Sequence, residues 1–296
     1  MNISRLFDQF ENTKVLVLGD VMIDAYFYGS VSRISPEAPV PIVNLTKKEQ
    51  RLGGAANVAL NLKSLGAVPI ICSIKGNDAD GQRLKELCQE NGLVIEGLIN
   101  DYKRETTVKT RIIGNSHQLL RIDEEDTADI DESVEDLVYE AVNSFIDQVD
   151  VLIFQDYNKG LLTAELIQRV IALCTSKKVP MVVDPKFNNF YEYKGVTLFK
   201  PNKKEIQQAE NITDKLNLRD IKVLASTVRQ KLNANKIMTT LSEDGIIIIN
   251  ETETIHLPAH ARKILDVSGA GDSVLSVAAL CVAAGRSEER REGKEC

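Results

Sequence analysis

The sequence predicts an α/β protein with a doubly wound, mostly parallel sheet. Short apolar runs alternate with segments of helical periodicity over residues 149–249, which is the pattern of repeated strand–helix–strand units. Polar side chains directly follow several of these runs, as expected where the carboxyl ends of parallel strands line a ligand site. With 296 residues and 43% hydrophobic content, the chain can build one large core.

Composition argues against several classes of protein. The net charge of −7 disfavours a general nucleic-acid-binding surface. No apolar run is long enough to span a membrane, and the first residues do not resemble a signal peptide, so we expect a cytoplasmic protein. The five cysteines form no C-x-x-C pair and the three histidines lack metal-ligand spacing, so we expect neither a disulfide framework nor a zinc site.

The first predicted strand covers residues 14–19, an apolar run that ends in glycine. Asp20 and Asp24 follow it, so two carboxylates are expected near the carboxyl end of the strand, where open α/β sheets bind ligands. Taken singly, either residue could instead serve only as part of a turn.

Two segments interrupt the α/β pattern and predict a small accessory sheet. Residues 25–45 contain several prolines, which forbid a helix, and residues 106–122 form two β-rich runs around a turn at Gly114 and Asn115. We expect these strands to form a lid over the site. Because exposed strand edges favour pairing with another chain, the sequence also predicts a homodimer through the lid.

A helix is predicted to begin after Gly53 and Gly54 and to end at Gly66, because apolar residues recur at helical spacing between them. Asn57 lies in the first turn of this helix, beside unpaired backbone N–H groups. Its side-chain amide could bind a substrate hydroxyl or serve only as a helix cap.

The remaining elements alternate along the chain. Strands are predicted at 69–74, 149–154, 179–184, 196–199, 236–240 and 245–249, and helices at 80–91, 163–177, 203–209 and 218–232. The acidic segment 123–135 is expected to be a solvated loop and the start of another helix. Lys186, just past a strand end, could pair with an anionic substrate or remain a solvated lysine.

The stretch 264–275 is a candidate catalytic loop. It passes through Gly269, Ala270 and Gly271 to Asp272, and a helix is predicted to follow from Ser273. Small residues before a helix let backbone N–H groups converge on an anion, and a carboxylate placed there could act as a base. On local grounds, a glycine-rich helix start with aspartate as an ordinary cap explains the pattern equally well.

Longer motifs narrow the choice. The sequence contains neither the P-loop pattern G-x-x-x-x-G-K-[ST] nor a G-x-G-x-x-G after the first strand. Residues 53–59 (GGAANVA) and 266–273 (DVSGAGDS) instead resemble two motifs of the PfkB (ribokinase-like) carbohydrate kinase family. The resemblance runs from about the N-terminus to Gly285, and it implies a ribokinase-like fold with a small β lid.

This resemblance implies a role for each candidate residue on the sugar side of the site. Asp272 would be the catalytic base, and the backbone of Gly269, Ala270 and Gly271 would form the anion hole. Lys186 and Arg111 would face the phosphate of the sugar. The residues that would hold sugar hydroxyls are Asp24, Gly53, Gly54 and Asn57.

The resemblance also implies the cofactors ATP and Mg²⁺, and further a monovalent cation such as K⁺. Glu205 would hold Mg²⁺ through water, and Asp266 with Ser268 would help to hold the monovalent cation. The residues that would serve the nucleotide are Asn202, Glu205, Thr240, Ser242 and Gly245.

Within the family, the chain looks closest to the heptose 7-phosphate kinase domain of lipopolysaccharide-precursor synthesis, which is often fused to an adenylyltransferase. The segments that carry this likeness are 19–24 (GDVMID), 32–41 (SRISPEAPVP), 156–160 (DYNKG) and 184–186 (DPK). We therefore expect ATP-dependent phosphorylation of heptose 7-phosphate at its anomeric hydroxyl, a step toward ADP-heptose. The alternatives are a family kinase acting on fructose phosphate, ribose or a nucleoside, and a non-catalytic sugar or nucleotide binder.

The end of the chain departs from the family pattern. Residues 286–296 (RSEERREGKEC) resemble the translation of a sequencing adapter with one residue changed. The sequence therefore predicts a kinase domain over residues 1–285 followed by a non-native tail, with the C-terminal helices of family members missing. A genuine charged C-terminal tail is the alternative.

Overall fold

The structure is a computed structural model that describes residues 3–259 and 269–292. These residues form a nine-stranded central sheet, in the order β13-β12-β11-β10-β9-β8-β1-β4-β5, and a four-stranded sheet, in the order β3-β2-β6-β7. The central strands are β1 (Lys14–Gly19), β4 (Val68–Gly76), β5 (Val94–Asp101), β8 (Val151–Gln155), β9 (Met181–Asp184), β10 (Leu198–Phe199), β11 (Lys236–Thr240), β12 (Ile246–Ile249) and β13 (Thr254–Leu257).

Strand directions confirm the predicted mostly parallel sheet. The pairings from β5 through β11 are parallel, whereas β12 runs antiparallel to β11 and β13 antiparallel to β12. The carboxyl ends of the parallel strands therefore share one edge of the sheet, which is where such folds bind ligands.

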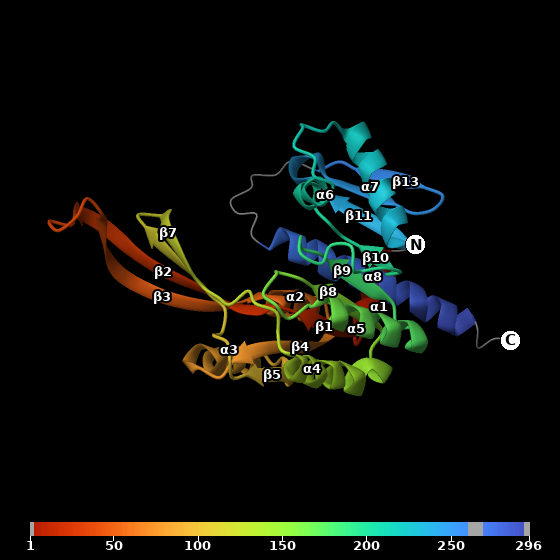
Figure 1. Ribbon diagram of the computed structural model, residues 1–296, viewed down its shortest axis with the longest axis horizontal. Coiled ribbons are helices and arrows are strands. Elements are labelled where there is room, and N and C mark those ends of the chain that lie inside the picture. Colours follow the sequence, from red (N-terminus) through yellow and green to blue (C-terminus); the bar gives the residue numbers. More distant parts are fainter. Residues whose placement is uncertain (1–2, 260–268, 293–296) are drawn as a thin grey trace.

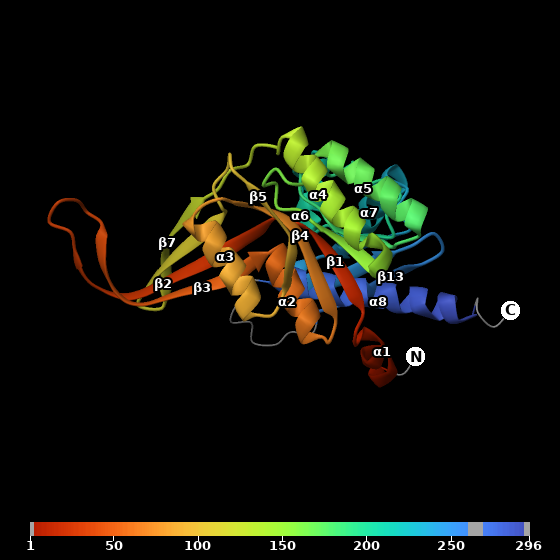
Figure 2. The same ribbon diagram turned by 90° about the horizontal axis from the view of Figure 1, so that it is seen from below.

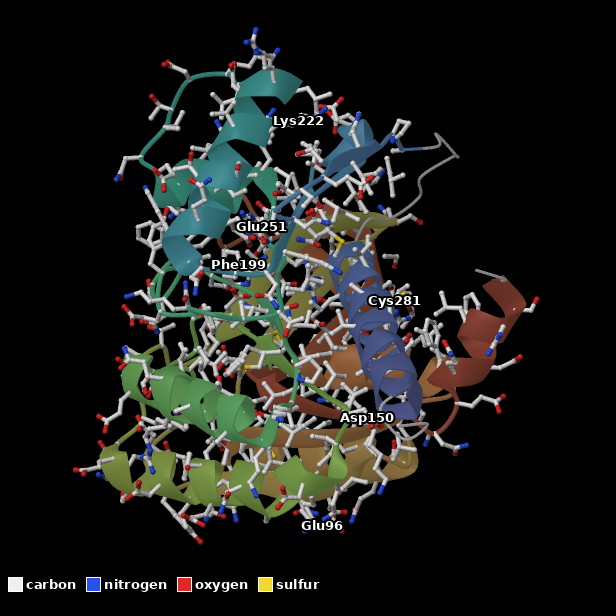
Figure 3. The ribbon with its side chains drawn as sticks, turned by 90° about the vertical axis from the view of Figure 1, so that its right-hand side faces the viewer. Glu96, Asp150, Phe199, Lys222, Glu251 and Cys281 are labelled. Carbon is white, nitrogen blue, oxygen red and sulfur yellow. The ribbon has the colours of Figure 1, made fainter. Side chains whose placement is uncertain are left out.

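Helices cover both faces of the central sheet (Figure 2). One face packs against α4 (Glu132–Phe145), α5 (Ala164–Lys177), α6 (Lys203–Ala209) and α7 (Leu218–Leu232). The other face packs against α1 (Ile3–Phe10), α2 (Ala55–Ser64), α3 (Ala79–Glu90) and α8 (Ala270–Glu292). Figure 3 shows the same separation, with α8, which carries Cys281, and α5 on opposite sides of the sheet.

Strand β1 shows how the sequence builds both cores. Leu16 and Leu18 are buried in the core on the side of α4 to α7, whereas Val15 and Val17 are buried in the core on the side of α1, α2, α3 and α8. Successive side chains of a strand point to opposite faces, so a strand buried on both faces must be apolar throughout. This is why a continuous apolar run predicts the strand correctly.

The four-stranded sheet projects from one side of the body as a lid (Figure 1). Its strands are β2 (Val21–Ile34), β3 (Pro41–Gly54), β6 (Val108–Gly114) and β7 (His117–Glu124), so the accessory sheet predicted from 25–45 and 106–122 is present and its strands extend beyond both ranges. Only Asp20 separates β1 from β2, and it therefore joins the central sheet to the lid. The β6–β7 turn lies at Asn115 and Ser116, one residue later than predicted, and both have positive φ.

Several elements differ from the sequence analysis. It does not identify α1, β5 or β13; β5 and β13 are edge strands with mixed polar and apolar residues, so they lack the apolar run of a central strand. The acidic segment 123–135 is not all solvated loop, because Glu125 pairs with Lys109 at 2.9 Å and with Lys159 at 2.7 Å.

The last helix begins three residues earlier than predicted, at Ala270 instead of Ser273. Glycine is a poor helix former, which is why the sequence pattern favours a loop over 269–271. The backbone of α8 is described through Glu292, and the assignment of 286–296 as a non-native tail stays a prediction.

Candidate active site

Asp272 lies in the first turn of α8, with only 8% of its surface exposed. Its Oδ2 accepts a hydrogen bond from Asn57 Nδ2 at 2.6 Å, and its Oδ1 accepts one from the Tyr157 hydroxyl at 3.1 Å. Burial raises the pKa of Asp272 despite these two hydrogen bonds, which act in the opposite direction. The carboxylate is therefore held in place and binds a proton more readily than an exposed aspartate, as a general base requires.

The turn that carries Asp272 can hold an anion. Because α8 begins at Ala270, the backbone N–H groups of its first turn have no acceptor within the helix. Gly269 has φ of +76°, and a Cβ at that position would lie 3.3 Å from Asn57 Nδ2. Gly269, Ala270 and Gly271 are exposed to solvent. The helix dipole adds partial positive charge here, so the turn fits an anionic group.

A buried ion pair lies beside this turn. Lys200 Nζ is 3.0 Å from Asp184 Oδ2, and Lys200 is only 3% exposed. A Cβ on Gly271 would lie 3.9 Å from the same Nζ, so the ammonium group is close to the first turn of α8. Lys200 therefore adds positive charge next to the turn that fits an anion.

Two glycines bring the lid close to Asp272. A Cβ on Gly53 would lie 2.5 Å from Asp24 Oδ2, and Gly54 has φ of +59° with its Cβ position 2.3 Å from the carbonyl oxygen of Asp20. Only glycine fits where β3 passes into α2. This tight passage sets the start of α2 and so places Asn57 against the carboxylate of Asp272.

The lid carries the predicted Arg111 on the same face as Asp24. Arg111 donates a hydrogen bond to Asp24 Oδ1 and forms an ion pair with it. The guanidinium groups of Arg111 and Arg51 lie 5.2 Å and 5.0 Å from the centre of the Tyr26 ring. This face of the lid thus presents two arginines beside a carboxylate, a set that suits a hydroxylated and anionic ligand.

Asn202 and Glu205 form a capping box at the start of α6. The Glu205 N–H donates to Asn202 Oδ1 at 2.9 Å, and the Asn202 N–H donates to Glu205 Oε2 at 2.8 Å. Lys186 Nζ is 2.5 Å from Glu205 Oε1. Asn202 also pairs with Thr240 in a parallel bridge. The structure thus brings Lys186 together with three of the residues predicted to serve the nucleotide.

Ser242 and Gly245 lie in the turn between β11 and β12, which includes the 3₁₀ turn η2 (Ser242–Asp244). They have φ of +55° and +90°, and the Leu241 N–H donates to the Gly245 carbonyl at 2.8 Å. Ser242 is exposed, whereas Gly245 is buried. The predicted nucleotide loop is therefore a tight turn that directly follows Thr240.

The two cations predicted to face the phosphate of the sugar lie in different parts of the site. Lys186 contacts Glu205, and its Nζ lies 5.6 Å from the centre of the Tyr157 ring. Arg111 instead contacts Asp24 on the lid. Lys186 thus belongs with the residues predicted to serve the nucleotide, and Arg111 with those predicted to hold the sugar.

Sequence reasoning missed three residues of this site. It names Asp20 only as a strand-end carboxylate, and it assigns no role to Tyr157 or Lys200. Tyr157 belongs to the segment 156–160 that carries part of the family resemblance, which could have drawn attention to it. Lys200 stands two residues before Asn202, but nothing in its local sequence shows that it is buried beside Gly271.

Asp266 and Ser268, predicted to help hold a monovalent cation, lie outside the described residues. Over residues 3–259 and 269–292, no group of three or more His, Cys, Asp or Glu side chains is close enough together to hold a metal ion. In the same part of the chain, no helix combines the length and the apolar character needed to cross a membrane.

Comparison with known sequences agrees with the family resemblance of the two glycine-rich motifs. The family model described as pfkB family carbohydrate kinase matches residues 12–290. The bifunctional protein HldE of Syntrophotalea carbinolica is 41% identical over 285 residues, which are 96% of this chain and 58% of that protein. HldE of Geobacter sulfurreducens is 36% identical over 288 residues, again 96% of this chain and 58% of the relative. The chain therefore spans a little over half the length of these curated relatives.

Solved structures show the same fold at low sequence identity. The tetrameric inhibited form of phosphofructokinase-2 from Escherichia coli superposes with a TM-score of 0.76 at 17% identity, covering 93% of this chain and 88% of that one. A putative ribokinase from Agrobacterium tumefaciens superposes with a TM-score of 0.72 at 16% identity, covering 93% and 85%. The fold is thus ribokinase-like, as the resemblance implies.

Proposed function

The chain belongs to the pfkB family of carbohydrate kinases, and we propose that it transfers the γ-phosphoryl group of ATP to the anomeric hydroxyl of heptose 7-phosphate. The observation that carries this proposal is Asp272, a buried carboxylate in the same helical turn as backbone N–H groups that have no acceptor within α8. A base for the acceptor hydroxyl and a cradle for the transferred group are the two parts that phosphoryl transfer requires.

The proposed reaction assigns a step to each of these groups. Asp272 takes the proton of the anomeric hydroxyl, and the oxygen attacks the γ-phosphorus in line. The new oxygen–phosphorus bond forms as the bond to the bridging oxygen of ADP breaks, so ADP leaves and the sugar gains a phosphate. The N–H groups at the start of α8 and the ammonium group of Lys200 stabilise the negative charge of the transferring group.

Kinases of this family use ATP with a divalent metal ion, and we assign Mg²⁺ to this role. Glu205 would hold it through water. Each Glu205 oxygen accepts one hydrogen bond, from Lys186 or from the Asn202 N–H, and retains further lone pairs. Mg²⁺ commonly binds through few carboxylates, waters and substrate phosphates, which fits this arrangement. When bound, it neutralises charge on the nucleotide phosphates.

Two further assignments rest on the sequence resemblance. K⁺ would lie near Asp266 and Ser268. ATP would lie against the turn after Thr240, with Ser242 and Gly245, and beside Asn202. The cytoplasmic location expected from the sequence also remains part of the proposal.

Three observations favour heptose 7-phosphate over other sugars. The short segments of closest family resemblance are those of heptose 7-phosphate kinases, and the relatives compared above are named bifunctional protein HldE. The lid supports a substrate that bears a phosphate, because Arg111 and Arg51 lie on the same face as Asp24. A nucleoside would need no such cations.

Replacing Asp272 by Asn tests the base. The amide keeps the size of the side chain but cannot take a proton, so turnover of heptose 7-phosphate and ATP should fall at least about a hundredfold. Release of ADP in a coupled assay measures turnover, and calorimetry should show that heptose 7-phosphate still binds. Turnover within tenfold of the unsubstituted protein would contradict the assignment.

The choice of sugar needs its own control. Fructose 6-phosphate and ribose should be poorer acceptors than heptose 7-phosphate for the unsubstituted protein. If either were phosphorylated with a higher kcat/KM, the heptose assignment would fail while the role of Asp272 would stand.

A second copy of the chain is the partner that we assign to the lid. Phe27, Ile112 and Leu120 pair across neighbouring strands and so share the face opposite to Asp24. Leu120 and Ile122 on this face are exposed. An apolar sheet face that extends into solvent favours association, and a twofold arrangement of two lids would cover it.

A further inference from the structure

Tyr157 contacts the base but belongs to a different part of the chain. It lies in the loop after β8, and its hydroxyl donates to Asp272 Oδ1 at 3.1 Å. The two residues are 115 positions apart in the sequence. Tyr157 also lies beneath Lys186, whose Nζ is 5.6 Å from the ring centre. The ring is thus enclosed between the base and the group of residues around Glu205.

The backbone of this loop is held by carboxylates. Asp20 Oδ2 accepts hydrogen bonds from the N–H groups of Tyr157, at 2.8 Å, and Lys159, at 3.2 Å. Asp156 Oδ1 accepts one from the Asn158 N–H at 2.8 Å. Asp20 is itself fixed at the carboxyl end of β1, which pairs with β8 and β4 inside the central sheet. The loop therefore presents Tyr157 to Asp272 from a rigid support.

The direction of the hydrogen bond is defined by the two groups. Burial, together with the charge of Asp272, raises the pKa of Tyr157 far above its ordinary value, so the hydroxyl keeps its proton and acts as the donor. Asn57, on α2, donates to the other carboxylate oxygen, Oδ2. Two donors, one in the loop after β8 and one on α2, thus fix both the rotation and the tilt of the carboxylate of Asp272.

We propose that Tyr157 is a positioning residue for the base: its hydroxyl holds Oδ1 of Asp272 so that Oδ2 is the oxygen that takes the proton of the sugar hydroxyl. This inference rests on the proposed function, because it requires Asp272 to act as the base. Asn57, which lies at Oδ2, would then contact the same sugar hydroxyl in the complex.

The other charged groups that face Asp272 do not supply this restraint. Asp184, at the end of β9, raises the pKa of Asp272, and Lys200, after β10, lowers it. These two groups pair with each other at 3.0 Å. They act on Asp272 through charge, whereas the hydrogen bonds that its carboxylate accepts from side chains within residues 3–259 and 269–292 come from Tyr157 and Asn57.

Replacing Tyr157 by Phe removes the hydroxyl and keeps the ring. We expect kcat to fall about tenfold, because the base is less well oriented, while KM for heptose 7-phosphate and ATP stays within about twofold. Loss of a donor to the carboxylate raises the pKa of Asp272, so the acid limb of the kcat/KM profile should move to higher pH. A purely structural role would not move this limb.

Tyr191 provides a matched control. Its hydroxyl donates to Glu210 Oε1, and this hydrogen bond is partly buried like that of Tyr157, so Tyr191→Phe also removes one partly buried tyrosine–carboxylate hydrogen bond. The acid limb of the kcat/KM profile of this control variant should stay where it is in the unsubstituted protein. This should hold even if the melting temperature of the control falls as much as that of Tyr157→Phe.

The comparison with Asp272→Asn separates the two proposals. If Asp272→Asn is inactive but Tyr157→Phe keeps both kcat and the position of the acid limb, the positioning role is wrong and the proposed base stands. If Asp272→Asn remains active, the proposed function itself fails. An equal shift of the acid limb in Tyr191→Phe would also overturn the assignment to Tyr157.

Discussion

Asp20 is a buried carboxylate at the junction of the two sheets, and its Oδ2 accepts two backbone N–H groups. Burial raises its pKa, and the nearby charge of Asp156 raises it further, to about 7. The folded protein therefore binds a proton at Asp20 at pH values where the unfolded chain, with an ordinary aspartate, has released it. The stability that Asp20 contributes is greatest below about pH 4 and is lost as the pH rises through about 7.

Asp20→Asn should flatten this dependence. The amide oxygen can still accept the N–H groups of Tyr157 and Lys159, but it does not ionise. We expect the free energy of unfolding to fall less between pH 4 and pH 8 in the variant than in the unsubstituted protein. Denaturant unfolding at several pH values in that range measures this free energy. An equal change of the free energy of unfolding with pH in the two proteins would show that Asp20 does not titrate as described.

At this scale, the sequence predicts residues that lie in signature motifs. Asp272, Asn57 and Gly269 stand in two short motifs, and the structure brings them into contact or close approach. Tyr157 and Lys200 could not be assigned in the same way, because their importance comes from closeness to residues far away in the sequence, Asp272 for Tyr157 and Gly271 for Lys200. A tyrosine in a loop has the same local pattern whether its hydroxyl meets solvent or a carboxylate.

Among the elements, the lid has the clearest link to substrate choice. Arg111 on β6 should contact the phosphate of the sugar, and in this structure it pairs with Asp24. Arg111→Met should raise KM for heptose 7-phosphate at least about tenfold, because a charge-assisted contact is lost, and should leave KM for ATP unchanged. Steady-state kinetics with each substrate varied in turn measures both values.

Lys48→Met is the control for that experiment. Lys48 lies on β3 and pairs with Phe27, so it is a lid cation on the opposite face from Asp24. Its KM values should match those of the unsubstituted protein. If Arg111→Met raised both KM values equally, the lid would be disturbed as a whole and Arg111 would not be specific for the sugar.

At this scale, prediction succeeds where an element has one dominant pattern. Helices α6 and α7 and strand β11 match their predicted bounds, because caps and apolar periodicity agree. Strand β5 lacks such a pattern: it contains Glu96, Gly97 and Asn100 and lies at the edge of the described sheet, so no apolar run marks it. The start of α8 was placed too late because Gly269 and Gly271 disfavour a helix on propensity alone.

For the molecule as a whole, the apolar lid face predicts association. Leu120 is 54% exposed on β7, and Leu120→Lys would place a charge on the proposed contact between two lids. Sedimentation should show a dimer for the unsubstituted protein and a monomer for the variant. Val223→Lys on α7, where the native side chain is 63% exposed, should remain dimeric. A monomeric unsubstituted protein would rule out the lid dimer.

The fold as a whole was predictable because inner strands of the central sheet, such as β1, β8 and β9, are buried on both faces, which leaves a strong apolar signal in the sequence. The relative placement of the two predicted phosphate-binding cations could not be predicted from the sequence. Lys186 and Arg111 look alike in sequence as loop or strand cations, and only the packing of β9, α6 and the lid separates them.

The hydrogen bond between Asn57 and Asp272 joins residues 215 positions apart. Contacts of such sequence separation form late, because the chain must close a long loop before they gain anything. During synthesis, the lid strands and α2 leave the ribosome well before α8 exists. A nascent chain can therefore complete its lid and half of its sheet while the aspartate that would abstract the proton has yet to be translated, and catalytic competence arises only when the two ends of the fold have met.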